Sequence, residues 1–141
     1  MVCNTIHLYY DKLQKEIKTP IIDLKEELKK RLVAGNVKIV TVLGTPNTIK
    51  KGLYKFDSIK YINPAEKELN QLSNAIFNFN KGVEKGKQKE IVKKICKKYS
   101  QKADITILGC TEFAIMLKKE KNVINTIDVL VNATIDKIQK L

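Results

Sequence analysis

The chain has 141 residues, 43% of them hydrophobic and 30% charged, which fits one globular domain or one domain with part of another. Its formal net charge of +12 comes almost wholly from lysines spread over expected helix surfaces, which favours small anionic ligands over nucleic acid. The apolar runs fall short of the roughly 20 residues of a membrane span and the N-terminus does not resemble a signal peptide, so we expect a cytoplasmic protein.

Two amphipathic helices are predicted at the start of the chain. Apolar residues at helical spacing indicate a helix over residues 6–17, which ends before Pro20. Residues 21–22 are expected to form a short strand, and the second helix follows and ends at Gly35. The apolar stripe of this second helix consists of Leu24, Leu28 and Leu32.

Strands and helices alternate through the rest of the chain. The β-branched run over residues 37–43 is typical of a strand buried on both faces. Further strands are expected over residues 59–62, 105–108 and 123–124, and further helices over residues 48–54, 63–80, 87–99, from 112 onward and over 130–141. This alternation predicts an α/β fold in which a parallel sheet carries helices on both faces.

Two of the three cysteines, Cys3 and Cys110, each follow an expected strand and precede a helix. Ligands of such sheets gather at the carboxyl ends of the strands. Because a helix N-terminus favours an anion, we expect a lowered pKa for the Cys110 thiol and the highest reactivity of the three. Cys96 faces the core side of its helix and is assigned no chemistry. Widely spaced cysteines and a single histidine, His7, support neither a disulfide framework nor a metal site.

Three motifs follow one another in a recognisable order. The first, Cys3-Asn4-Thr5-Ile6-His7, resembles the first-lobe cysteine motif of the aspartate/glutamate racemase superfamily, and Leu108-Gly109-Cys110-Thr111-Glu112 closely resembles the second-lobe motif. Between them, Gly44 and Thr45 with Thr48 and Tyr54 resemble the Gly-Thr-x-x-Thr turn of the family. Glutamate racemases carry histidine at the position of Glu112, so the resemblance is greater to the aspartate racemase branch.

The resemblance implies a cofactor-independent amino-acid racemase in which Cys3 and Cys110 lie on opposite sides of the α-carbon. One cysteine removes the proton and the other returns one to the opposite face. The carbanion is then stabilised by exclusion of water and by hydrogen bonds to the substrate carboxylate. Glu112 and the cationic chain favour a small dicarboxylic amino acid, aspartate rather than glutamate.

The resemblance also implies a set of substrate-binding residues, and His7 is either a helix-packing residue or a catalytic one. The substrate-binding residues are Asn4, Thr5, Thr45, Lys81, Thr111 and Glu112.

Only two residues precede Cys3, fewer than a usual strand of about 5 to 6 residues. We therefore expect residues 1–36 to be the end of a first lobe and residues 37–141 to be a complete second lobe. The chain alone is then expected to racemise little or not at all, and to form a homodimer through an exposed stripe of Leu24, Leu28 and Leu32. Two alternatives stay open: decarboxylation or cis-trans isomerisation of a dicarboxylate on the same scaffold, and a non-catalytic carboxylate-binding or assembly module.

Overall fold

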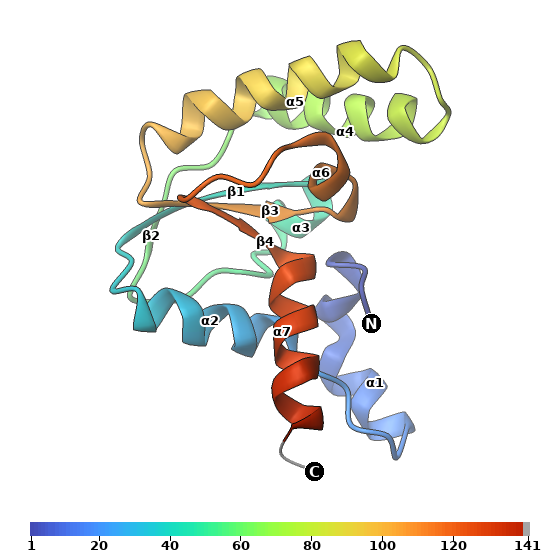
Figure 1. Cartoon of the computed structure of the whole chain (residues 1–141), viewed down its shortest axis with the longest axis vertical. Coiled ribbons are helices and arrows are strands. Elements are labelled where there is room, and N and C mark those ends of the chain that lie inside the picture. Colours follow the sequence, from blue (N-terminus) through green and yellow to red (C-terminus); the bar gives the residue numbers. More distant parts are fainter. Residues whose placement is uncertain (140–141) are drawn as a thin grey trace.

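A computed structural model of the chain describes residues 1–139, which form a four-stranded parallel sheet between two layers of helices (Figure 1). The order of the strands is β2-β1-β3-β4. The strands are β1 (Ile39–Gly44), β2 (Lys60–Tyr61), β3 (Ile105–Gly109) and β4 (Val123–Asn125). The helices are a 3-10 turn η1 (Thr5–Tyr9), α1 (Tyr10–Glu16), α2 (Leu24–Ala34), α3 (Pro46–Lys50), α4 (Glu66–Asn80), α5 (Lys85–Ser100), α6 (Thr111–Met116) and α7 (Thr126–Ile138).

The two central strands, β1 and β3, are buried on both faces, as their β-branched sequences predict. They pair in parallel from Val40 opposite Ile105 to Gly44 opposite Gly109, so both strands end at the same edge. At this edge a side chain at Gly44 would bring its Cβ within 3.2 Å of the carbonyl oxygen of Gly109. A larger residue would press against the backbone of β3, so glycine is favoured where the two strands end.

One face of the sheet is covered by α4 and α5, with α6 at its carboxyl edge (Figure 1). Their apolar sides pack against Leu43 and Leu108, which point to this face of β1 and β3. Cys96 of α5 belongs to the same core and is 6% exposed, so its predicted position in the core is confirmed.

The opposite face is covered by α2 and α7 (Figure 1). The prediction that Leu24, Leu28 and Leu32 form an exposed stripe was wrong: all three are fully buried. They pack in one core with Val40 and Val42 of β1, so the second helix covers the sheet of this chain. These leucines therefore do not offer a dimer interface, and the homodimer itself stays a prediction.

The N-terminal segment differs most from its prediction. A 3-10 turn and the short α1 replace the single helix expected over residues 6–17, and the apolar side chains of Ile6, Tyr9 and Ile17 are exposed. Residues 21–22 lie outside any strand; instead, the backbone N–H of Ile21 donates to the Gln14 side chain at 2.7 Å.

The other predicted elements are confirmed with small shifts of their ends. The helix expected over residues 48–54 is shorter and begins at Pro46, and the last helix begins at Thr126 rather than at residue 130. The predicted end of that helix at Leu141 lies outside the described residues. Among the residues described, no helix combines the length and the apolar character that crossing a membrane requires.

Candidate functional site

The candidate site lies at the carboxyl edge of the sheet, where β1 leads into α3 and β3 leads into α6 (Figure 1). Thr45 caps the N-terminus of α3 by accepting a hydrogen bond from the backbone N–H of Thr48, and Pro46 fits the first helical position. Cys110 is the extended residue that precedes α6. The chain thus turns into a helix directly after each of the two central strands.

Three threonine hydroxyls connect the N-terminal segment to this edge. Thr48 is buried, and its hydroxyl oxygen lies 3.0 Å from that of Thr5 and 3.2 Å from that of Thr45. Two of the predicted substrate-binding residues, Thr5 and Thr45, are therefore brought together, although 40 positions separate them in the sequence. Thr48, which the sequence analysis placed in the turn motif but not in the site, is the residue that joins them.

Tyr54 connects the two cysteine motifs to each other. Its hydroxyl donates a hydrogen bond to the side-chain oxygen of buried Asn4, the residue after Cys3. Its ring lies against Gly109, the residue before Cys110, since a Cβ added there would be 3.5 Å from the ring. The side-chain nitrogen of Asn4 is buried and has no hydrogen-bond partner among the described residues. A predicted substrate-binding residue thus carries an unpaired donor next to Cys3.

The second cysteine forms a compact network with the carboxylate of Glu112. The Cys110 thiol donates to one carboxylate oxygen at 2.9 Å, and the hydroxyl of Thr111 donates to the same oxygen at 2.9 Å. The side-chain amide of Asn80, at the end of α4, donates to the other oxygen at 2.9 Å. Both predicted neighbours of Cys110 therefore belong to its surroundings, and Asn80 is a participant that the sequence analysis missed.

The expected lowering of the Cys110 pKa was wrong. Burial and the hydrogen bond to the Glu112 carboxylate raise the pKa of the Cys110 thiol to about 12. Burial alone would raise the pKa of Glu112, but hydrogen bonds from Cys110, Asn80 and Thr111 outweigh it and hold that pKa at about 2. The thiol is thus protonated and the carboxylate ionised over the physiological range, and the short α6 does not reverse this.

Cys3 differs from Cys110 in its surroundings because its side chain is exposed. A negative charge on Cys3 raises the pKa of Cys110, as the least of its causes, and it also adds to the effect of burial in raising the pKa of Tyr54. Cys3 is therefore near enough to influence both groups electrostatically. Because Cys3 is exposed and Cys110 is partly buried, we now expect the Cys3 thiol, rather than that of Cys110, to be the most reactive of the three.

The remaining candidates lie at the margin of the site. Lys81 follows Asn80 at the end of α4, and its ammonium lies 4.3 Å from the centre of the Phe77 ring. His7 is buried, with its Nε2 atom 3.0 Å from the carbonyl oxygen of Met1. Burial lowers the pKa of His7 below its usual value. The predicted role of Lys81 in substrate binding and the possible catalytic role of His7 stay predictions.

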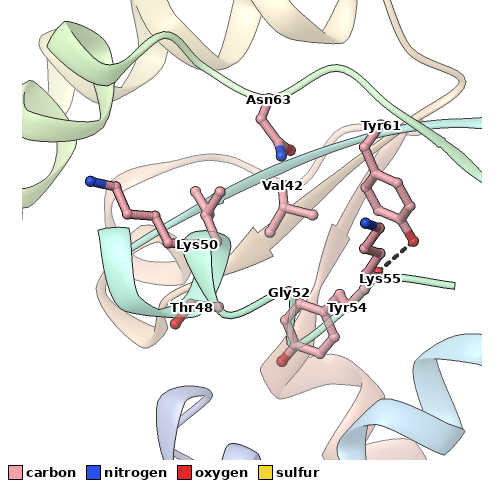
Figure 2. A pocket seen from close by; sticks show the side chains of 9 residues that line it. Val42, Thr48, Lys50, Gly52, Tyr54, Lys55, Tyr61 and Asn63 are labelled. Carbon is pink, nitrogen blue, oxygen red and sulfur yellow. Dashed lines mark hydrogen bonds between the residues drawn. The ribbon is translucent and has the colours of Figure 1, made fainter.

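Thr48 and Tyr54 also line a separate cavity of about 260 Å³ (Figure 2). The hydroxyls of both residues point away from it, because they bond to Thr5 and Asn4 of the N-terminal segment. The side chains of Lys55 and Asn63 line this cavity instead. It is therefore distinct from the edge that carries the cysteines.

The fold and the two cysteine motifs define an α/β protein of the racemase type. The Asp/Glu/Hydantoin racemase family model matches residues 1–134, and the chain belongs to this family. It is 27% identical over 135 residues to a glutamate racemase of Aquifex pyrophilus, covering 92% of this chain and 52% of the relative. It is 29% identical over 132 residues to the broad specificity amino-acid racemase RacX of Bacillus subtilis (strain 168), covering 89% and 56%.

Solved structures share the fold. An aspartate racemase homologue from Pyrococcus horikoshii OT3 superposes with a TM-score of 0.77 at 24% identity, covering 95% of this chain and 63% of the other. The aspartate racemase of Picrophilus torridus gives a TM-score of 0.68 at 20% identity, covering 89% and 55%. The chain spans about half the length of the curated relatives that it matches.

Proposed function

We propose that this chain carries the acid and base of a cofactor-independent amino-acid racemase, with Cys3 and Cys110 as the catalytic residues. The observation that supports this most strongly is the Tyr54 bridge. Its hydroxyl bonds to Asn4 beside Cys3 while its ring lies against Gly109 beside Cys110. Two sulfur atoms near one sheet edge suit a reaction that needs a proton acceptor and a proton donor at the same carbon.

The surroundings of the two thiols support unequal starting roles. The Cys110 thiol donates a hydrogen bond to the Glu112 carboxylate and so carries the proton. We therefore assign Cys110 as the acid, and Cys3 as the base, in one of the two directions of racemisation. The thiolate of Cys3 removes the α-proton, and the electron pair of the broken C–H bond stays on the carbanion. Cys110 then gives its proton to the opposite face and is left as the thiolate. The reverse reaction exchanges the two roles.

The polar groups around the thiols support an acidic amino acid as the substrate. The unpaired side-chain nitrogen of Asn4 is a donor that a substrate carboxylate would satisfy. Thr5 follows Asn4 in the sequence, and the hydroxyls of Thr5 and Thr45 both lie within 3.2 Å of the Thr48 hydroxyl. We propose aspartate rather than glutamate as the preferred substrate, because of Glu112 in place of histidine and the +12 net charge. Lys81 is proposed to face the second carboxylate of the substrate.

Titration followed by NMR tests the proposed ligand class. Adding L- or D-aspartate is expected to shift the backbone signals of Asn4, Thr5 and Thr111, with weaker binding of glutamate. Replacing Thr5 by valine, which keeps the shape but removes the hydroxyl, should weaken aspartate binding. The matched control is Thr134→Val on helix α7, whose hydroxyl donates a hydrogen bond to the backbone carbonyl of Leu130 and contacts none of the proposed substrate-binding residues through a hydrogen bond within the described residues. Tighter binding of glutamate, or equal effects of both variants, would contradict the assignment.

We also propose that the 141-residue chain alone turns over slowly. It spans about half the length of its curated relatives, and Cys3 is exposed to water. An open site weakens the hydrogen bonds that stabilise a carbanion, and a displacement of about 1 Å between reacting groups can cost on the order of 100-fold in rate. A purely non-catalytic carboxylate-binding module would instead bind aspartate without any exchange of its α-proton.

A further inference from the structure

Within the described residues, three side chains donate hydrogen bonds to the Glu112 carboxylate, and they differ in where they come from. Cys110 and Thr111 are its immediate neighbours in the chain and move together with the start of α6. Asn80 reaches it from the end of α4, 32 positions earlier in the sequence. Asn80 is therefore the one donor of the three that ties Glu112 to a different part of the fold.

This external contact matters because a glutamate side chain has several rotatable bonds. Glu112 lies at the first turn of a six-residue helix and is only partly buried, so water competes for its carboxylate. Hydrogen bonds to an ionised group are shorter and stronger than neutral ones, and they hold a flexible side chain in one rotamer. One oxygen accepts from Asn80 while the other accepts from Cys110, so the first contact orients the second.

We propose that Asn80 is a positioning residue, which keeps the Glu112 carboxylate turned towards the Cys110 thiol and so favours the proton-bearing form of Cys110. The catalytic meaning of this rests on the proposed function, in which one cysteine starts as the acid. The geometric claim itself concerns the thiol and does not depend on turnover.

The charges around Cys110 decide the direction of the expected effect. The ionised groups that raise its pKa are Glu112, from α6, and Cys3, from the N-terminal segment. The nearby Lys81 has its ammonium over the Phe77 ring. Releasing Glu112 into solvent therefore removes a group that favours the thiol over the thiolate. Loss of Asn80 should lower the pKa of Cys110 and increase its thiolate fraction at a given pH.

Alkylation by iodoacetamide, resolved by mass spectrometry and repeated between pH 7 and 10, measures this fraction for each cysteine. Two variants remove the donor: Asn80→Ala, and Asn80→Leu, which preserves the branching of the side chain. We expect Cys110 to react about three- to tenfold faster at pH 8 in both, which corresponds to a fall of half to one pKa unit. Glu112→Gln, which removes the charge itself, should accelerate Cys110 at least as much.

The matched control is Asn74→Ala, which removes an exposed asparagine from the same helix. The buried Cys96 serves as an internal measure of folding, because it should stay slow in every variant. If Cys110 in both Asn80 variants reacts as in Asn74→Ala, the inference is overturned. A chain that shows the expected acceleration but exchanges no substrate proton would leave the positioning role standing and refute the proposed racemase.

Discussion

The hydrogen bond from Tyr54 to Asn4 can be removed by a single substitution, which tests how the N-terminal segment is held on the sheet. Tyr54→Phe removes one hydroxyl and leaves the ring in place against Gly109. Both partners are almost fully buried, at 2% and 3% exposed. The change therefore tests whether the N-terminal cysteine motif is fastened to the second one.

The loss of stability in Tyr54→Phe follows from the buried polar atoms of Asn4 that remain without a hydrogen-bond partner. The side-chain nitrogen of Asn4 already has no partner, so the variant would leave both ends of a buried amide without one. Leaving a buried polar group unsatisfied costs about 1 to 3 kcal/mol, more than the net contribution of the bond itself. For a chain of this size, such a loss lowers Tm by roughly 3 to 10 °C.

Urea unfolding and hydrogen exchange over residues 4–10 measure the effect. Tyr9→Phe is the matched control, because Tyr9 is exposed and the substitution should change the free energy of unfolding by less than about 0.5 kcal/mol. Replacing both partners, as in Asn4→Leu with Tyr54→Phe, should recover part of the loss, since no polar group is then stranded. If Tyr54→Phe costs no more than Tyr9→Phe, the bridge does not hold the two motifs together.

Three further outcomes are expected. Leu28 is fully buried and Val33 is exposed, so Leu28→Ala should lower the free energy of unfolding in urea by about 2 to 5 kcal/mol and Val33→Ala by less than about 0.5 kcal/mol. Similar losses in the two variants would mean that the leucines of α2 lie outside the core. Burial lowers the pKa of His7, so the imidazole binds a proton more readily in the unfolded chain than in the folded one, and the free energy of unfolding should fall from pH 7.5 to 5.5. His7→Asn should abolish this pH dependence; a pH dependence that is unchanged in the variant would assign it to other groups. At pH 8, iodoacetamide should modify Cys3 well before Cys110, and the opposite order would refute the raised pKa of the buried thiol.

The sheet was predictable because its strands are recognisable from short stretches of sequence. β1 and β3 are short β-branched runs followed by glycine, and helical patterns separate them. The α2 stripe was equally visible as a pattern, but its partner was not. Leucines at helical spacing look the same whether they pack on the sheet of their own chain or on another surface, and here they pack against Val40 and Val42.

The site was predictable only as far as its motifs reach. Thr5, Thr45, Thr48 and Glu112 stand in recognisable motifs, whereas Asn80 does not. The contacts that join Thr5 to Thr48 and Asn80 to Glu112 span 43 and 32 positions, so they depend on the folded chain. The expected lowering of the Cys110 pKa rested on the helix N-terminus alone. Burial and a carboxylate two residues away affect this thiol more strongly, and only the packed structure shows where that carboxylate points.

Deuterium incorporation at the α-carbon of L- and D-aspartate in D₂O tests the racemase proposal most directly. It should be measured on this chain and on its Cys3→Ala, Cys110→Ala and Cys96→Ala variants. We expect slow exchange of both enantiomers that is lost in the first two variants and retained in Cys96→Ala, whose thiol lies in the core. Exchange that is absent from the unsubstituted chain, or that persists without Cys3 or without Cys110, would contradict the assignment of these two thiols as acid and base.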